Sequence, residues 1–264
     1  MNEETSQGNL STILSGSVLT VALDRPHVHN AMNPQLIEDL TRLFAEISAR
    51  EDERVVILTG SGRSFCAGAD LAAMRAAADY DYEQNVSGGE AIFDLMASID
   101  RCPRPVVGRI NGTAVGGGVG LVSCCDIVVA VEKAKFAFSE VRLGLVPAVI
   151  SPFVLRKIGA GSARELFLTG ERFDAFEARR IGLVQHVTTA EKLDEVVAER
   201  VELLLNGAPE AQTSVKQLIR SLEHLPLQEQ RRYTAEMLAD RRASEEGREG
   251  MSAFLQKRKP DWQT

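Results

Sequence analysis

The sequence contains 264 residues, of which 44% are hydrophobic and 25% are charged, and its formal net charge is −7. This length and apolar content suit one large domain, or one domain with an appendage, rather than a disordered chain. Because the charge balance is acidic, the chain lacks the clustered Lys and Arg that nucleic acid binding requires, and we expect no nucleic acid partner.

The ends and cysteines of the sequence indicate its compartment. No apolar run approaches the roughly 20 residues needed to cross a bilayer, and the N-terminal segment MNEETSQGN does not resemble a signal peptide. We therefore expect a soluble, cytoplasmic protein without a membrane partner. The four cysteines form no C-x-x-C pair, and no histidine follows at metal-ligand spacing, so reduced thiols and no metal site are predicted.

The first part of the chain alternates between strand and helix patterns. Residues 17–23 and 55–60 are short runs of β-branched and apolar residues that end in turn residues, and we predict a strand at each. A helix is predicted between them, because Asn33 is a suitable N-cap, Pro34 suits a first turn, and apolar residues then recur at helical spacing.

A second cycle follows the same order. We predict a helix over about residues 86–100, a strand at 106–110, a glycine-rich turn, a short apolar helix and a strand at 126–131. This regular alternation of strands and helices predicts an α/β fold class for the body of the protein.

From about residue 161 the pattern becomes mostly helical, with apolar stripes between charged faces. We divide the chain into a core that carries the active site, residues 1–195, and a C-terminal helical region, residues 196–264. Such stripes usually pack on the protein's own core, but several successive amphipathic helices at a chain end also suit contact between subunits.

Several common catalytic and nucleotide-binding motifs do not occur. The sequence contains no G-x-x-x-x-G-K-[ST], no complete G-x-G-x-x-G, no G-x-S-x-G and no H-E-x-x-H. Nucleotide triphosphate and dinucleotide sites, serine hydrolase chemistry and zinc peptidase chemistry are therefore disfavoured.

Two glycine-rich turns are the most informative segments, namely GSGRSFCAGADL at 60–71 and NGTAVGGGVG at 111–120. Each follows a predicted strand and opens a predicted helix. The first amides of a helix are unpaired and carry partial positive charge, so such a turn can bind an anion, and two turns can share one oxygen. Glycines at strand ends can also serve only to turn the chain or to allow close packing.

These turns and four further segments resemble the crotonase superfamily, also called the enoyl-coenzyme A hydratase/isomerase family. The resemblance implies a crotonase-like spiral of ββα repeats and a C-terminal helical trimerisation region, with trimers often pairing into hexamers. It rests on LDRPHVHNAM at 23–32, SFCAGADL at 64–71, PVVGRINGTAVGGGVGLVSCCDIVVA at 105–130, FSEVRLGLVP at 138–147, LTGERFDAFEARRIGLV at 168–184 and REGMSAFLQKRKP at 248–260.

The resemblance also implies the site residues. The amides of Ala69 and Gly117 would form an oxyanion hole for the thioester enolate, and Glu140 would carry the proton. An acyl-CoA would be the substrate, and because coenzyme A enters as part of it, no separate cofactor is expected. The matching substrate- and CoA-binding positions are His29, Ala31, Ala67, Asp70, Leu71 and Gly116, joined by Phe254 and Lys257, often from a neighbouring subunit.

The chain departs from the family's pattern at two places. Typical hydratases of the family carry a second glutamate where this chain has Gly120, and PAVISPFVLRKIG at 147–159 replaces a P-G-A-G-G-T type of turn. In these respects the chain resembles bacterial methylglutaconyl-CoA and carboxygeranoyl-CoA type hydratases, which take branched, carboxylated enoyl thioesters. Arg142 or Arg156 could then pair with a distal substrate carboxylate, although each also suits a surface role.

Three functions follow from this pattern. The first is an enoyl-CoA hydratase in which Glu140 alone both activates the water and transfers the proton. The second is a double-bond isomerase with Glu140 as its sole base, because isomerisation needs only one group that moves a proton between carbons. The third, from another class, is a non-catalytic trimeric scaffold that binds acyl-CoA.

Overall fold

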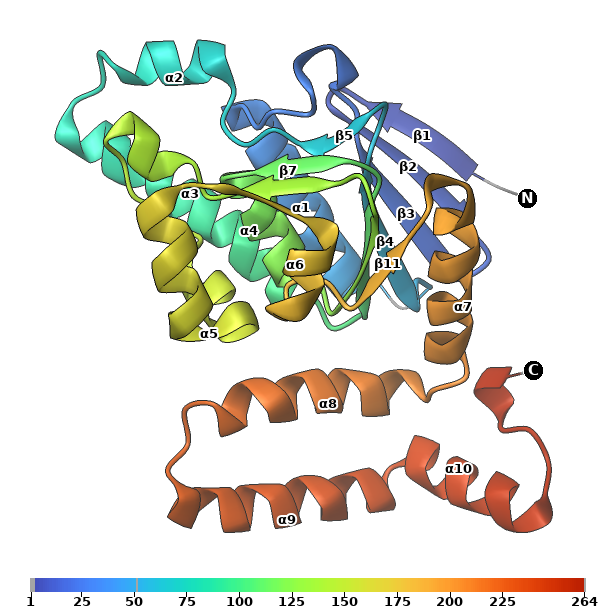
Figure 1. Ribbon diagram of the computed structural model, residues 1–264. Coiled ribbons are helices and arrows are strands. Elements are labelled where there is room, and N and C mark those ends of the chain that lie inside the picture. The colour runs from blue at the N-terminus through green and yellow to red at the C-terminus, as the bar shows by residue number, and fades with distance from the viewer. Residues whose placement is uncertain (1–2, 51, 264) are drawn as a thin grey trace.

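Two β-sheets and the helices between their strands form the body of the protein, and three further helices form a separate layer (Figure 1). The structure is a computed structural model and describes residues 3–50 and 52–263.

The larger sheet has seven strands in the order β1-β2-β3-β4-β6-β8-β11. The pairs β1–β2 and β2–β3 are antiparallel, whereas every pair from β3 to β11 is parallel. The parallel strands are rich in buried Val, Ile and Leu, as expected for strands covered on both faces. Their bounds are β1 (Glu3–Gln7), β2 (Leu10–Ser15), β3 (Val18–Leu23), β4 (Val55–Gly60), β6 (Val106–Ile110), β8 (Ile127–Val131) and β11 (His186–Thr188).

The smaller sheet has four strands of three residues each, in the order β10-β9-β7-β5. Strands β4, β6 and β8 of the large sheet are each followed by one of these short strands and then by a helical segment. This repetition is the ββα spiral that the family resemblance predicts, and it is confirmed. The bounds are β5 (Ser64–Cys66), β7 (Thr113–Val115), β9 (Lys135–Ala137) and β10 (Arg172–Asp174).

The helices of the body begin where the sequence provides caps. The side chain of Asn33 accepts a hydrogen bond from the Leu36 amide at 2.9 Å, which starts the first helix at Pro34 as predicted. Helix α4 lies inside the body with seven of its eight residues buried. The bounds are α1 (Pro34–Ala49), α2 (Leu71–Ala77), α3 (Tyr82–Asp100), α4 (Gly117–Cys124), α5 (Ser151–Thr169), α6 (Ala175–Arg180) and α7 (Leu193–Leu205).

The C-terminal layer consists of α8 (Pro209–Leu222), α9 (Leu227–Ala243) and α10 (Glu245–Gln256), which lie beneath the body in Figure 1. Within the described part of the chain, α8 and α9 have no buried residue. The predicted boundary between residues 195 and 196 falls inside α7, and α7 buries Val197 and Val201 against the large sheet. The division of the chain into two regions stays a prediction.

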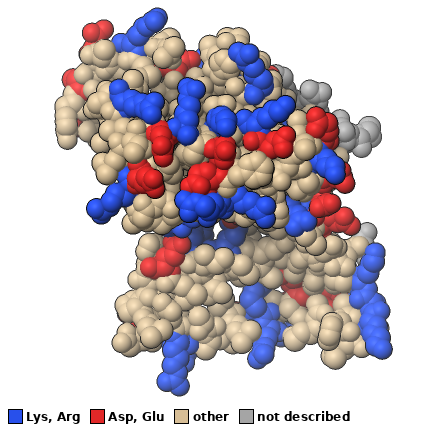
Figure 2. Space-filling view, viewed as in Figure 1, with Lys and Arg blue, Asp and Glu red and all other residues tan. Residues whose placement is uncertain are grey.

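The chain after residue 161 is mostly helical, as expected, but it also contributes the short strands β10 and β11, which pair with strands of the core. Among the described residues, no helix is long and apolar enough to cross a membrane. Figure 2 shows acidic and basic side chains interspersed over one face of the body.

Candidate active site

The segment around Met32 runs beside the first glycine turn and fixes its direction. The amide of Ala67 donates to the carbonyl of His29 at 3.0 Å, the amide of Met32 donates to Gly68 at 2.7 Å, and the amide of Asp70 donates to Met32 at 3.0 Å. Met32 and Ala69 thus form a parallel bridge. In this pairing the residues on either side of Ala69 bond to Met32, so the Ala69 N–H points away from that segment. Ala69 is exposed.

The second glycine turn ends at the head of α4. Gly116 is the N-cap, with φ 53° and ψ −121°, a conformation that L side chains rarely adopt. Gly117 is the first residue of the helix and is half-buried, so its amide belongs to the group that lacks an intrahelical acceptor. The N-terminal end of a helix carries partial positive charge, which strengthens the attraction of this amide for an anion.

Close backbone contact brings the two turns together. A Cβ atom at Gly68 would lie 2.6 Å from the carbonyl oxygen of Val115 and 3.8 Å from Cα of Gly116, and Gly68 has φ +88°. In the same way, a side chain at Gly118 would collide with Cys66. Only glycine allows this approach, which places Ala69 and Gly117 on neighbouring segments.

Glu140 lies against the second turn. It opens a 3-10 helix (Glu140–Leu143) directly after β9, and the amide of Gly116 donates to the carbonyl of Ala137 on that strand at 2.8 Å. A Cβ atom at Gly116 would lie 3.0 Å from Oε1 of Glu140. The carboxyl group is therefore held beside the head of α4.

The electrostatic state of Glu140 follows from its burial. The Oε2 atom is buried and has no hydrogen-bond partner among the described residues. Loss of solvent raises the pKa of the Glu140 carboxyl above its usual 4.5, because the charged form is disfavoured when water is excluded. A carboxyl group whose pKa is raised in this way is a suitable group to accept a proton and return it.

Asp70 fixes the other side of the Met32–Ala69 bridge. Its Oδ1 accepts hydrogen bonds from the amides of Ala72 and Ala73 at 2.8 and 3.2 Å, which caps α2. Its Oδ2 pairs with Arg25 at 2.9 Å, and the same guanidinium nitrogen donates to the carbonyl of Ala31 at 2.5 Å. Burial alone would raise the pKa of Asp70, but these hydrogen bonds outweigh it and hold the pKa below its usual value.

The side chain of Asp70 is therefore occupied by structural contacts. Of the other residues predicted to bind coenzyme A, His29 lies at the same edge, with Nδ1 3.0 Å from Oγ of Ser64 and Nε2 3.3 Å from Arg63. Leu71 is exposed at the first position of α2. The structure thus brings together His29, Ala31, Ala67, Ala69, Asp70, Leu71, Gly116, Gly117 and Glu140.

Phe254 and Lys257 lie elsewhere. They are in and directly after α10, which packs on α8 and α9 in the layer below the body, whereas the glycine turns lie in the body beside β5 and β7 (Figure 1). The Phe254 side chain is 82% exposed. Within one chain, these two residues are not brought to the site.

The two departures from the family's pattern meet in space. A Cβ atom at Gly120 would lie 2.5 Å from Cγ2 of Ile150 and 3.0 Å from Cε of Met96. Ile150 belongs to the PAVIS segment, so the unusual turn fills the space next to the unusual glycine. Gly120 is buried, and the exposed fractions of Ile150 and Met96 are 2% and 0%.

The two candidate arginines have different surroundings. Arg156 pairs with Asp100 at 2.8 Å and with Glu223 at the end of α8 at 3.6 Å, so two carboxylates of its own chain already bind its guanidinium. The side chain of Arg142 lies beside Gly170 at the end of α5, 3.2 Å from where a Cβ atom there would be.

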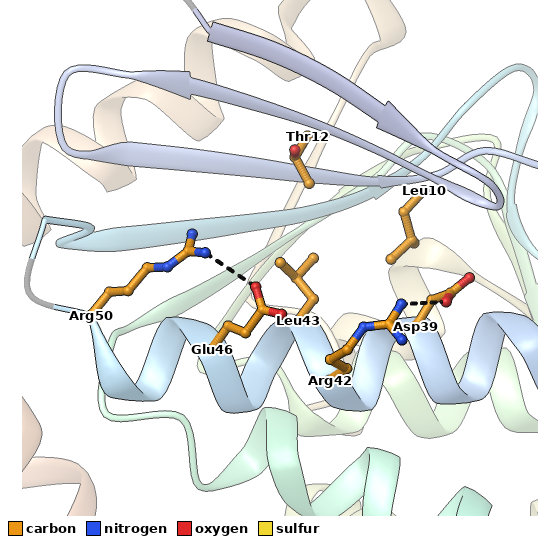
Figure 3. A pocket seen from close by; sticks show the side chains of 7 residues that line it. All are labelled: Leu10, Thr12, Asp39, Arg42, Leu43, Glu46 and Arg50. Carbon is orange, nitrogen blue, oxygen red and sulfur yellow. Dashed lines mark hydrogen bonds and ion pairs between the residues drawn. The ribbon is translucent and has the colours of Figure 1, made fainter.

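A separate hollow lies between α1 and β2, and ion pairs of 2.8 Å (Arg42–Asp39) and 3.1 Å (Arg50–Glu46) line it (Figure 3). It contains none of the predicted site residues. Its lining consists of Leu10, Thr12, Asp39, Arg42, Leu43, Glu46 and Arg50.

Similarity to known proteins identifies the family of this chain. The profile of the enoyl-CoA hydratase/isomerase family matches residues 14–264. The chain belongs to this family. It is 37% identical over 221 residues to an enoyl-CoA hydratase of Alternaria alternata, covering 83% of this chain and 72% of that protein. The chain also resembles two solved structures. One is an enoyl-CoA hydratase from Shewanella pealeana, with a TM-score of 0.93 and 38% identity, covering 97% of this chain and 96% of that one. The other is Pseudomonas aeruginosa AtuE, with a TM-score of 0.95 and 34% identity, covering 97% of this chain and 100% of that one.

This enoyl-CoA hydratase/isomerase family member is therefore an enzyme that acts on an acyl-CoA thioester, which removes the non-catalytic scaffold from the alternatives. The expected absence of a separate cofactor and the expected cytoplasmic location stay predictions.

Sequence reasoning did not identify three residues that shape this family member's site. Arg25 and Asn30 lie within LDRPHVHNAM, and Asn30 is fully buried with its side-chain amide donating to the carbonyls of Ser61 and Ser64 at 2.9 and 2.8 Å. Their position inside one of the six segments that carry the family resemblance was a signal for both. Ile150 gave no signal, because an apolar residue in an apolar segment suggests only core packing.

Proposed function

We propose that the protein is an enoyl-CoA hydratase that stabilises an enolate with the amides of Ala69 and Gly117 and moves the proton with Glu140. The placement of the Glu140 carboxyl beside Gly116, at the head of α4, carries this proposal. It sets a half-buried proton carrier next to the amides that would receive the thioester oxygen.

The proposed reaction uses one carboxyl group twice. The Glu140 carboxylate takes a proton from water while the oxygen of that water adds to Cβ of the enoyl thioester. The electron pair of the double bond moves onto the thioester oxygen, where the two amides stabilise the negative charge. The protonated carboxyl then returns the proton to Cα, so one water is added. Loss of one such amide typically costs ~2.7–4 kcal/mol of transition-state stabilisation.

The Glu140→Gln variant tests the proton carrier. The amide keeps the shape of the side chain but cannot exchange the proton, so we expect kcat on crotonyl-CoA to fall by about 10²–10⁴-fold. Binding of a non-reacting acyl-CoA, measured by calorimetry, should change little. Wild-type kcat in this variant would rule out the role of Glu140.

The rival function is double-bond isomerisation, and the observation in its favour is Gly120, because one base suffices for a proton shift between carbons. Incubation with 2-enoyl and 3-enoyl thioesters in ¹⁸O-labelled water separates the two. A hydratase incorporates one labelled oxygen into a 3-hydroxyacyl product. An isomerase interconverts the two enoyl thioesters with no label in either.

We propose further that the substrate is branched or carboxylated, as in methylglutaconyl-CoA. The support is the PAVIS segment, whose Ile150 packs against Gly120, the position where typical hydratases of the family carry a second glutamate. Arg142 remains the candidate partner for a distal carboxylate. Equal kcat/KM values for crotonyl-CoA and methylglutaconyl-CoA would contradict a specialised pocket.

We also propose that the active assembly is a homotrimer or a hexamer in which Phe254 and Lys257 reach the coenzyme A of a neighbouring subunit. The separation of these residues from the site within one chain supports this arrangement. Positive charge from Lys257 would suit the phosphates of coenzyme A.

A further inference from the structure

The first turn of α4 has two different neighbours. Gly116 and Gly120 are four residues apart, and the amide of Gly120 donates to the carbonyl of Gly116 at 3.2 Å. Gly120 therefore lies one helical turn beyond the N-cap, about 6 Å along the axis. Glu140 lies against Gly116, whereas Ile150 and Met96 lie against Gly120.

Ile150 leaves no room for a side chain at position 120. The 2.5 Å between Cγ2 of Ile150 and a Cβ atom at Gly120 is far shorter than a van der Waals contact, and Cβ of Ile150 would be 3.1 Å away. The terminal methyl of Met96 could rotate aside, but the branched stem of Ile150 is stiff, since only a few χ1 rotamers are open to it. Ile150 is therefore the residue that leaves no room for a side chain at position 120.

We propose that Ile150 limits the site to a single proton-carrying side chain by filling the space beside Gly120. This inference rests on the proposed role of Glu140. Glu140 lies against Gly116 at the head of α4, and one turn further along α4 the branched side chain of Ile150 fills the space beside Gly120, so no second carboxyl group can enter from α4. Ile150 thus acts as a positioning residue that determines how many acid–base groups serve the reaction.

A cycle of thermal-stability measurements with Gly120→Ala tests whether Ile150 fills the space beside Gly120. In a helix, alanine is normally more stable than glycine, so with free space the substitution would raise the thermal midpoint. With Ile150 present we expect a fall of roughly 5–10 °C, as for overpacked cores. In an Ile150→Ala background the same substitution should be neutral or stabilising. A rise in the thermal midpoint with Ile150 in place would overturn the proposal.

Val149→Ala provides the matched control. Val149 precedes Ile150 in the chain, but its Cγ1 lies 3.5 Å from a Cβ position at Gly89 on α3 and not at Gly120. The Val149→Ala background should therefore leave the loss caused by Gly120→Ala unchanged. Equal rescue by both backgrounds would mean general loosening of the core and would overturn the specific role of Ile150.

A gain-of-function experiment tests whether a carboxyl group at position 120 can take part in the reaction. In a Glu140→Gln background, the double change Gly120→Glu/Ile150→Ala introduces a carboxyl group one turn beyond Gly116, and we expect hydration of crotonyl-CoA to rise at least about tenfold over Glu140→Gln alone. Gly120→Glu with Val149→Ala should give no gain. A folded double variant, by circular dichroism, without any gain would overturn the claim that this space serves the reaction.

The proposed function can fail separately. If Glu140→Gln by itself kept wild-type turnover, the role of Glu140 would be lost, and the inference that Ile150 leaves a single proton carrier would fall with it. The stability cycle would in that case still decide whether Ile150 closes position 120.

Discussion

Burial of the Glu140 carboxyl has a direct effect on the pH dependence of the reaction. Because its pKa is raised above 4.5, the carboxylate that removes a proton from water forms only as the pH rises through this higher value. We expect the acid limb of the kcat/KM profile on crotonyl-CoA to have an apparent pKa above 4.5. The residual activity of Glu140→Gln should lack this limb, and an unchanged limb in that variant would assign it to another group.

The same burial affects stability with the opposite pH dependence. A carboxyl whose folded pKa exceeds its unfolded pKa binds more protons in the folded state, so it costs stability as the pH rises through that window. Glu140→Gln should therefore have a higher thermal midpoint than wild type at pH 8, by a few degrees. The difference should shrink toward pH 4.5, and a lower midpoint at pH 8 would contradict the burial of this carboxyl.

Arg25 should contribute more to stability than an exposed arginine with equally close partners. Its pair with Asp70 is nearly enclosed, with 13% and 8% of the two side chains exposed. Removal of one partner of a buried pair leaves an unpaired charge and costs about 3–5 kcal/mol. Because two amides still bond Asp70, we expect Arg25→Met to lose roughly 3 kcal/mol, read as a lower thermal midpoint at fixed protein concentration.

Arg180→Met is the matched control for this loss. Arg180 bonds Glu177 at 2.5 Å, but its side chain is 67% exposed, and such surface pairs contribute little because solvent and salt screen the two charges. Similar losses in the two variants would show that burial of the Arg25–Asp70 pair does not decide its contribution.

At the scale of elements, the approach of the two glycine turns depends on Gly68. Gly68 and Gly144 both have positive φ, +88° and +72°, but only Gly68 faces a backbone oxygen within 4 Å. Alanine at either position should cost about 1–2 kcal/mol of backbone strain. Gly68→Ala should also displace Val115 and Gly116, so we expect kcat to fall at least about tenfold there and to stay near wild type in Gly144→Ala.

The elements also show how far the sequence predicts this molecule. The helix at Pro34 and the strands at 55–60 and 106–110 have caps or long apolar runs, and they occur as predicted. Strands of three residues, such as β10 and β11, hold too few side chains for a period to be visible, and their pairing depends on segments far away in the chain.

The sequence also predicts only part of the candidate site. The two glycine-rich turns were recognisable from their residue types and context, whereas the role of Glu140 was implied by the family resemblance. The pairing of Arg25 with Asp70 joins residues 45 positions apart, and the contact of Ile150 with Gly120 joins two different helical segments. Such contacts arise only once the chain is folded, and no local pattern encodes them.

At the scale of the whole molecule, the C-terminal layer is only partly covered by its own chain. Lys216 pairs with Asp126 at 2.5 Å and Arg220 donates to the carbonyl of Asp100 at 3.1 Å, which attaches α8 to the body. The exposed apolar side chains of the layer include Val215, Ile219, Leu227, Leu238, Met251, Phe254 and Leu255. Much of the surface over this layer carries no charge in Figure 2.

Complementation between subunits tests whether Phe254 and Lys257 serve a neighbour. We expect Glu140→Gln and a Phe254→Ala/Lys257→Ala variant each to have low activity. After co-expression, mixed assemblies contain sites with an intact Glu140 from one chain and intact tail residues from another, so activity should recover to about a quarter of wild type or less. Activity no higher than the mean of the two separate variants would place these residues in the same chain's site.

The four cysteines can report where this protein unfolds locally, because a thiol reagent labels them only when they become exposed. Cys66, Cys102, Cys124 and Cys125 are all buried and free, and burial raises the pKa of the Cys66 and Cys125 thiols to about 12. A thiol reagent can react only when a cysteine reaches water as thiolate. Cys66 lies beneath the two turns, whereas Cys102 lies between α3 and β6, so the labelling rates of these two sulfurs would separate local breathing of the catalytic turns from opening of the wider core.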